Sequence, residues 1–166
     1  MPNTNPIRPT DDDARALGRA LISGARFGAL GVIDPQTAAP MVSRIAVGTS
    51  EDGTPVALIS DLSHHTRALR EHAAASLLVG EPGSKGDPLT HPRLTLQGEA
   101  LFIDRNGLEH GALRTRWLAT HPKAKLYIDF ADFGFVRLVV TSAYLNGGFG
   151  KAFVLTSEDL GLDGPA

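Results

Sequence analysis

The stretch MVSRIAVGTSEDGTPVALISDLSHHTRAL, residues 41–69, predicts two strands followed by a helix. Apolar residues alternate with other residues over 40–50, and a second apolar run covers 56–62. The turn sequence EDGTP joins the two runs, so we expect them to form a β-hairpin. The polar segment 63–73 then has the residue types and spacing of a short helix.

Arg44 has an unusual position in the first of these strands. Alternation places Met41, Ser43, Ile45 and Val47 on one face and Arg44 on the other, among small apolar neighbours. A guanidinium in that setting must reach a counter-charge or the rim of the sheet. We expect the hairpin to bring Arg44 beside Ser60, where the second strand ends.

The rest of the chain continues with short strands and a few helices. Consecutive strands with tight turns favour an antiparallel barrel or sandwich, so we predict an α+β fold with a small barrel at its centre. Strands are predicted at 27–34, 75–82, 93–104 and 134–146, with a further piece in 147–155, and helices at about 10–26 and 107–121, with a short helical piece in 122–130.

A chain of 166 residues is long enough for one domain. Residues 1–10 contain prolines and asparagines and are predicted to be a flexible arm, residues 11–160 form the domain, and 161–166 form a tail. Thr10 precedes three aspartates, which predicts a threonine N-cap with acidic residues in the first helical turn.

Composition excludes several classes of protein. The net charge of -2 gives no basic surplus for binding nucleic acid, and there is no cysteine for disulfides, thiolate catalysis or Cys-based metal sites. No apolar run is long enough to span a bilayer, and the N-terminal segment lacks the order of a secretory signal. A cytoplasmic protein is expected.

The start of the helix at 63–73 has the side chains of an anion site. Its first N–H groups have no partners within the helix, and the helix dipole adds positive charge there. Ser63 and Thr66 supply hydroxyls, His65 an imidazole and Arg67 a guanidinium, which together suit a phosphate. The alternative is an ordinary helix cap with a solvated arginine. A metal site is not expected, because adjacent histidines on a helix point about 100° apart.

The order SRIAV, GTPVALISDLSHHTRAL, ASLLVGEP and GDPLTHPRLTLQGEA resembles the pyridoxamine 5'-phosphate oxidase-like split-barrel family, in the branch related to haem-utilisation proteins. WLATHPKAKLYIDFADFGFVRL and LNGGFGKAF extend the similarity over about 12–155. The resemblance implies a six-stranded antiparallel split β-barrel that forms a homodimer, with flavin mononucleotide (FMN) held between the subunits.

The resemblance also implies the cofactor-binding residues. The arginine strand and the start of the following helix hold the flavin phosphate in that family, and other segments approach the ribityl chain and the ring. The positions that match are Ser43, Arg44, Ile45, Ile59, Ser60, Ser63, His65, Thr66, Arg67, Arg93, Phe149 and Lys151. No catalytic residue is assigned, because the family leaves the chemistry to the cofactor.

Two departures from the family shape the expected function. The tail NGGFGKAFVLTSEDLGL lacks the arginine and histidine that bind substrate in the vitamin B6 oxidases, so that activity is not expected. No counterpart of the extra C-terminal domain of the haem-utilisation proteins is present, so haem degradation is not expected either. Three hypotheses follow: an FMN-dependent oxidoreductase of unknown substrate, a non-catalytic flavin or haem carrier or sensor, or a structural dimer with a decayed site.

Overall fold

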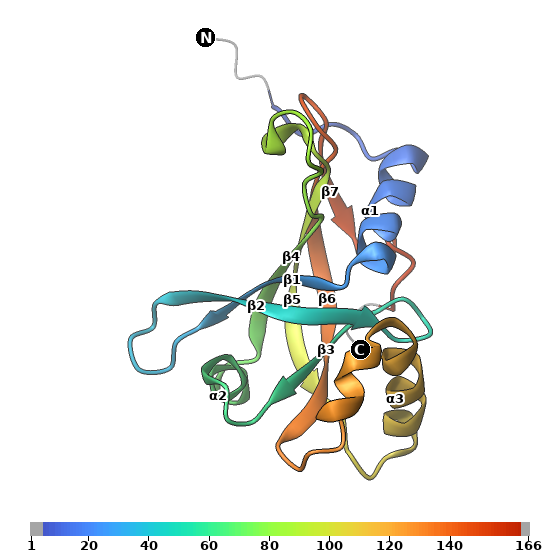
Figure 1. The fold of residues 1–166 in the computed structure, drawn as a ribbon. Coiled ribbons are helices and arrows are strands. Elements are labelled where there is room, and N and C mark those ends of the chain that lie inside the picture. The colour runs from blue at the N-terminus through green and yellow to red at the C-terminus, as the bar shows by residue number, and fades with distance from the viewer. Residues whose placement is uncertain (1–4, 164–166) are drawn as a thin grey trace.

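Seven antiparallel strands form one sheet that closes into a barrel (Figure 1). The computed structural model describes residues 5–163. The sheet order is β3-β2-β1-β4-β5-β6-β7, and pairing of β3 with β6 closes six strands while β7 continues the sheet beyond β6. The strands are β1 (Phe27–Ile33), β2 (Pro40–Thr49), β3 (Pro55–Ser60), β4 (Ala74–Val79), β5 (Arg93–Phe102), β6 (Phe133–Asn146) and β7 (Ala152–Thr156). The predicted α+β class and six-stranded barrel are confirmed.

Three α-helices flank the barrel. They are α1 (Asp12–Gly24), α2 (His64–Glu71) and α3 (Leu108–Thr120), with two short 3-10 helices, η1 (Pro88–Thr90) and η2 (Pro122–Leu126). The predicted N-cap of the first helix was wrong by one residue. Asp11 caps α1 by accepting from the Ala14 N–H at 2.7 Å, whereas the Thr10 hydroxyl donates to the carbonyl of Val154 at 3.1 Å. A carboxylate accepts a charge-assisted hydrogen bond, which makes it the better cap.

The segments outside the predicted domain are described only in part. Residues 1–4 of the predicted arm and 164–166 of the predicted tail lie outside the described residues. Within the arm, Ile7 forms a bridge with Ala152 of β7, and the Arg8 N–H donates to the Ala152 carbonyl at 2.8 Å. Within residues 5–163, no helix combines the length and the apolar character needed to cross a membrane.

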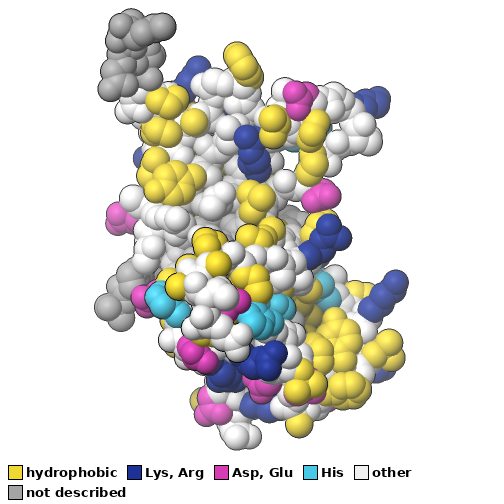
Figure 2. All heavy atoms as spheres, turned by 90° about the vertical axis from the view of Figure 1, so that its left-hand side faces the viewer, with side chains coloured by type: hydrophobic (Ala, Val, Ile, Leu, Met, Phe, Trp, Pro, Cys, Tyr) yellow, Lys and Arg dark blue, Asp and Glu magenta, His cyan; other side chains and the backbone are white. Residues whose placement is uncertain are grey.

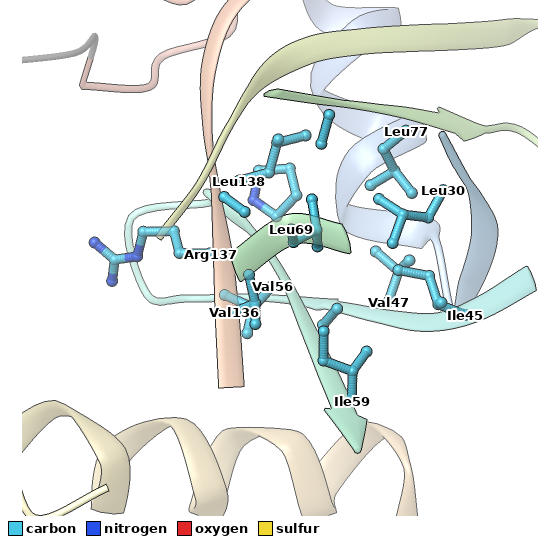
Figure 3. Close-up of a pocket in the computed structure, with 14 residues that line it drawn as sticks. Leu30, Ile45, Val47, Val56, Ile59, Leu69, Leu77, Val136, Arg137 and Leu138 are labelled. Carbon is cyan, nitrogen blue, oxygen red and sulfur yellow. The ribbon is translucent and has the colours of Figure 1, made fainter. Parts of the chain in front are cut away.

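The barrel interior is filled by the inward side chains of its strands. Leu94 and Leu96 of β5 are fully buried there, as the alternation of their strand requires. A cavity of about 30 Å³ remains, and Figure 3 shows Ile45, Ile59 and other aliphatic side chains around it. This apolar space is too small for a cofactor, so any cofactor must bind outside the barrel.

A second apolar cluster lies outside the barrel, where α3 and η2 pack over β3 and the start of β6. Trp117 of α3 stacks on His121 with ring centroids 4.2 Å apart and meets the Phe135 ring edge-on at 5.7 Å. A Cβ at Gly48 would lie 3.0 Å from the Trp117 ring, so a side chain there would require the ring to shift by a few tenths of an ångström. Figure 1 shows α1 and α3 on the right of the sheet. The outward faces of β1 and β4 carry exposed and half-buried residues.

The strands β2 and β3 separate before they reach the proposed anion site. Their ladder ends at Val47 opposite Ala57, and β3 then pairs only with β6, where Ser60 lies opposite Phe133. The expectation that the hairpin places Arg44 beside Ser60 is therefore wrong. The barrel closes through the β3–β6 ladder, and this pulls the end of β3 away from β2.

Candidate functional site

The junction of β2 and α2 brings two of the predicted residues together. Ser43 faces inward from β2, and its hydroxyl lies 3.1 Å from Nδ1 of His65 in the first turn of α2. The other ring nitrogen of His65, Nε2, is buried and has no partner among residues 5–163. Burial lowers the pKa of His65, so the ring is neutral at pH 7.

Two carboxylates stand beside the start of α2. Asp34 lies 3.3 Å from Nε2 of His64, and its pKa is lowered, mainly by the N–H of Gln36 and also by His64. Asp61 accepts from Arg70 at 2.8 Å. Ser63 occupies the N-cap position, but its hydroxyl makes no capping bond. These negative charges oppose a phosphate at this helix end.

Arg44 and Arg67 are both exposed, and neither pairs with a carboxylate in the described part of the chain. The Arg44 guanidinium lies 5.8 Å from the centre of the Phe27 ring, within range of a cation–π contact. Because Arg44 pairs with Ala29 in the β1–β2 ladder, it stands on the outward face of the sheet. It remains free to meet an acidic group of a ligand.

Several predicted residues have side chains that point into the barrel, are buried, or are already hydrogen-bonded within the chain. Ile45 and Ile59 point into the barrel (Figure 3), so only their backbones could meet a ligand outside it. Thr66 is 1% exposed. The Ser60 hydroxyl donates to Asp132 at 2.5 Å.

The remaining three predicted residues lie far from Arg44 along the sheet. Arg93 is on β5, three strands away, or roughly 14 Å at the usual strand spacing. Its guanidinium donates to the Leu89 carbonyl at 2.9 Å. Phe149 and Lys151 belong to the turn between β6 and β7, where Phe149 is 97% exposed. The fold therefore divides the predicted site between two regions of one chain.

A hollow of about 530 Å³ lies on the outward face of the sheet, and sequence reasoning missed it. The ladder places Val42, Gly31, Ser76 and Gln97 side by side across four strands. Gly31 and Ser76 have little or no side chain, which leaves the space above them open. The sequence feature that could have indicated this hollow is a glycine and a serine at outward positions of neighbouring strands.

A row of mostly apolar residues crosses the sheet next to this hollow. The ladders place Arg44, Ala29, Leu78, Thr95 and Tyr144 in order across five strands. Leu78 is 41% and Tyr144 48% exposed. Figure 2 shows apolar side chains exposed in several groups on the face it presents, with lysine and arginine side chains between them. The exposed Leu78 and Tyr144 make this row a candidate contact surface for a ligand or a partner.

The family of this protein follows from comparison with known families. A family model described as CREG, β-barrel matches residues 9–160, which is nearly the whole chain. The chain belongs to the CREG β-barrel family. A solved chain with a TM-score of 0.84 is 45% identical, over 92% of this CREG β-barrel protein and 98% of that chain.

Two relatives at 30% identity have names that refer to haem. The chloroplastic non-canonical heme oxygenase HOZ of Arabidopsis thaliana is 30% identical over 142 residues, which are 84% of this chain and 42% of the relative. The structure of a heme binding protein from Mycobacterium smegmatis is 30% identical, with a TM-score of 0.81, over 93% of this chain and 61% of that one. The chain thus spans less than two thirds of both.

The fold is shared with oxidase-like proteins as well. A Clostridium acetobutylicum protein related to general stress protein 26, of the pyridoxinephosphate oxidase family, has a TM-score of 0.68 at 12% identity, over 91% of this chain and 99% of that one. This likeness concerns the fold alone. The resemblance to the split-barrel family and its haem-related branch is confirmed.

Proposed function

We propose that this CREG β-barrel protein binds haem on the outward face of its sheet, with a second copy of the chain covering the same face. The observation that carries the proposal is the hollow over Gly31 and Ser76, next to the apolar row that ends at Arg44. Its volume of about 530 Å³ lies within the usual range of cofactor sites.

The residues of this face suit the two parts of haem. The ring is broad and apolar, and Phe27 and Ala29 of β1 together with Leu78 of β4 offer an apolar surface across two neighbouring strands. The propionates are acidic, and the unpaired guanidinium of Arg44 gives them a charge-assisted hydrogen bond. Bound haem would supply iron for redox chemistry or for binding a small gas.

The homodimer is part of the same proposal. Exposed Leu78 and Tyr144 cross the centre of the face, and a two-fold contact is the commonest way to cover such a surface. A two-fold contact could also bring Arg93, Phe149 and Lys151 of one copy toward Arg44 of the other. The division of the predicted residues between two regions of the chain supports this arrangement.

The second candidate is an FMN-dependent oxidoreductase. It is favoured by two arginines that pair with no carboxylate among residues 5–163. Arg44 and Arg67 could hold the flavin phosphate, and bound FMN would supply hydride or electron transfer. Against it stand Asp34 and Asp61 beside the start of α2, and Thr66, whose hydroxyl is buried. Haem needs no phosphate cradle and is therefore the first candidate.

The deciding experiment titrates the purified protein separately with haemin and with FMN. We expect a saturable Soret band with haemin, at a fixed ratio of haem to chain, and no saturable quenching of FMN fluorescence. Saturable FMN binding without haem binding would establish the second candidate instead. If neither ligand saturates, both cofactor proposals fail and the structural dimer is the remaining hypothesis.

A further inference from the structure

A second cleft, of about 370 Å³, lies at the end of the barrel that α2 covers. It is bounded by α2, the end of β3, the start of β6 and the segment 102–105 that follows β5. None of its lining residues lines the hollow on the outward face. The cleft is therefore a separate place for a ligand, independent of the proposed haem site.

Thr66 is one of the residues that line this cleft, and its buried hydroxyl has no hydrogen-bond partner among the described residues. The residue is 1% exposed. A helical threonine commonly bonds to the carbonyl one turn earlier, which this one does not. Because an unsatisfied buried hydroxyl is costly, a bound group that donates to it or accepts from it would be stabilised.

Gly134 of β6 leaves room in the same cleft. A Cβ built on Gly134 would meet nothing within 4 Å, and the backbone does not have the positive φ that would require glycine. Phe102 lines the same end of the cleft, whereas the Phe133 ring packs on Tyr127 in the second apolar cluster. The space suits a flat, mostly apolar molecule.

The charged groups around the cleft are already bonded, including Asp104, whose carboxylate accepts from the Asn106 N–H at 2.9 Å. Arg70 pairs with Asp61 and lies 4.1 Å over the Phe102 ring. Arg105 donates to four backbone carbonyls in the segment 129–133. Neither guanidinium is free to bind an anion. An occupant with a net charge would have to break these bonds, so the cleft favours a neutral one.

We propose that this cleft binds a neutral aromatic molecule that carries one hydrogen-bonding group, of the phenol or indole class. The ring lies beside Phe102 in the space before Gly134, and its hydroxyl or N–H bonds to Thr66. The charged rim, Arg70 with Asp61, stays paired and shields the site from water.

The test compares p-cresol with toluene, which has the same ring and methyl group without the hydroxyl. Both are titrated into the 15N-labelled full chain and followed by amide chemical shifts. We expect p-cresol to shift the amides of Thr66 and Gly134 and to bind roughly 3- to 10-fold more tightly than toluene. Equal binding of the two probes, or no shifts at these residues, would overturn the proposal.

Two variants connect the binding to the cleft. Thr66→Val keeps the shape of the side chain, so it should remove the preference for p-cresol and leave toluene binding unchanged. Gly134→Leu fills the free space and should weaken both probes at least about 10-fold, by analogy with steric rejection in tight pockets. Gly111→Leu, at an open position of α3, is the matched control. A preference for p-cresol that persists in Thr66→Val contradicts the assignment.

Discussion

The Ser43 hydroxyl and Nδ1 of His65 lie 3.1 Å apart, and their hydrogen bond joins the inward face of β2 to the first turn of α2. The two residues are 22 positions apart in sequence, so the bond fixes how α2 sits on the barrel. Removing it in Ser43→Ala should lower the free energy of unfolding by about 1 kcal/mol. Urea denaturation at pH 7.5 measures this, with Ser23→Ala on exposed α1 as the control.

The burial of His65 gives stability a pH dependence as well. Burial, and to a lesser extent the neighbouring His64, lower the pKa of His65 below its ordinary 6.5. Below about pH 6.5 the unfolded chain therefore binds more protons at this residue than the folded chain, so stability falls as pH falls. His65→Gln should make the decline between pH 7.5 and 5 shallower.

His110 requires its own control, because burial lowers its pKa too. His110→Gln should remove a separate part of the decline, and the double variant should show both effects together. The carboxylates with lowered pKa, including Asp34, titrate below this window. A decline unchanged in His65→Gln would contradict the argument.

Two substitutions on the outward face test the proposed cofactor. Arg44→Ala should weaken haem binding roughly 10-fold or more, since a charge-assisted bond contributes about 1.5–3 kcal/mol. Ser76→Leu should weaken it by filling the hollow. Arg67→Ala separates the candidates: it should leave haem binding unchanged but weaken FMN binding if the flavin phosphate is held there. Absorption titrations of each variant provide the measurement.

Self-association depends on the apolar row in our proposal. Leu78→Glu and Tyr144→Glu place charge in the centre of the face and should shift the protein toward monomer in sedimentation equilibrium. Leu126→Glu, on η2, changes an exposed leucine elsewhere, at 79% exposure, and should leave the association unchanged. A wild-type protein that stays monomeric at high concentration would refute the dimer, and haem binding would then have to be explained by one chain.

The strands could be predicted from the sequence because their inward and outward residues alternate. The pattern over 40–50 placed Ile45 and Val47 on one face and Arg44 on the other, and the structure shows that the first face lies inside the barrel. Barrel closure could not be read in the same way, because the β3–β6 ladder joins residues more than 70 positions apart. That ladder separates β3 from β2, which is why Arg44 does not lie beside Ser60.

The candidate site was harder to predict than the fold. The stretch at 63–67 predicted a group of polar side chains, but the helix turns them in different directions. His65 meets Ser43, Thr66 is buried and Arg67 is exposed. Sequence also could not show that Asp34, about 30 residues earlier, lies beside His64. Contacts between residues far apart in the sequence determine which polar groups remain available to a ligand. A single sequence does not reveal those contacts.

The bulge in β5 provides the last prediction. The register of β5 on β6 shifts between Gln97 and Gly98, and a Cβ on Gly98 would lie 2.0 Å from the carbonyl oxygen of Val139. Backbone cannot yield as a flexible side chain can, so Gly98→Ala should cost about 3 kcal/mol or more of unfolding free energy. Gly111→Ala, with open space around it near the start of α3, should instead stabilise the protein by about 0.5–1 kcal/mol. Thermal and urea denaturation of both variants measure the difference, and equal stabilities would mean that the bulge can relax without cost.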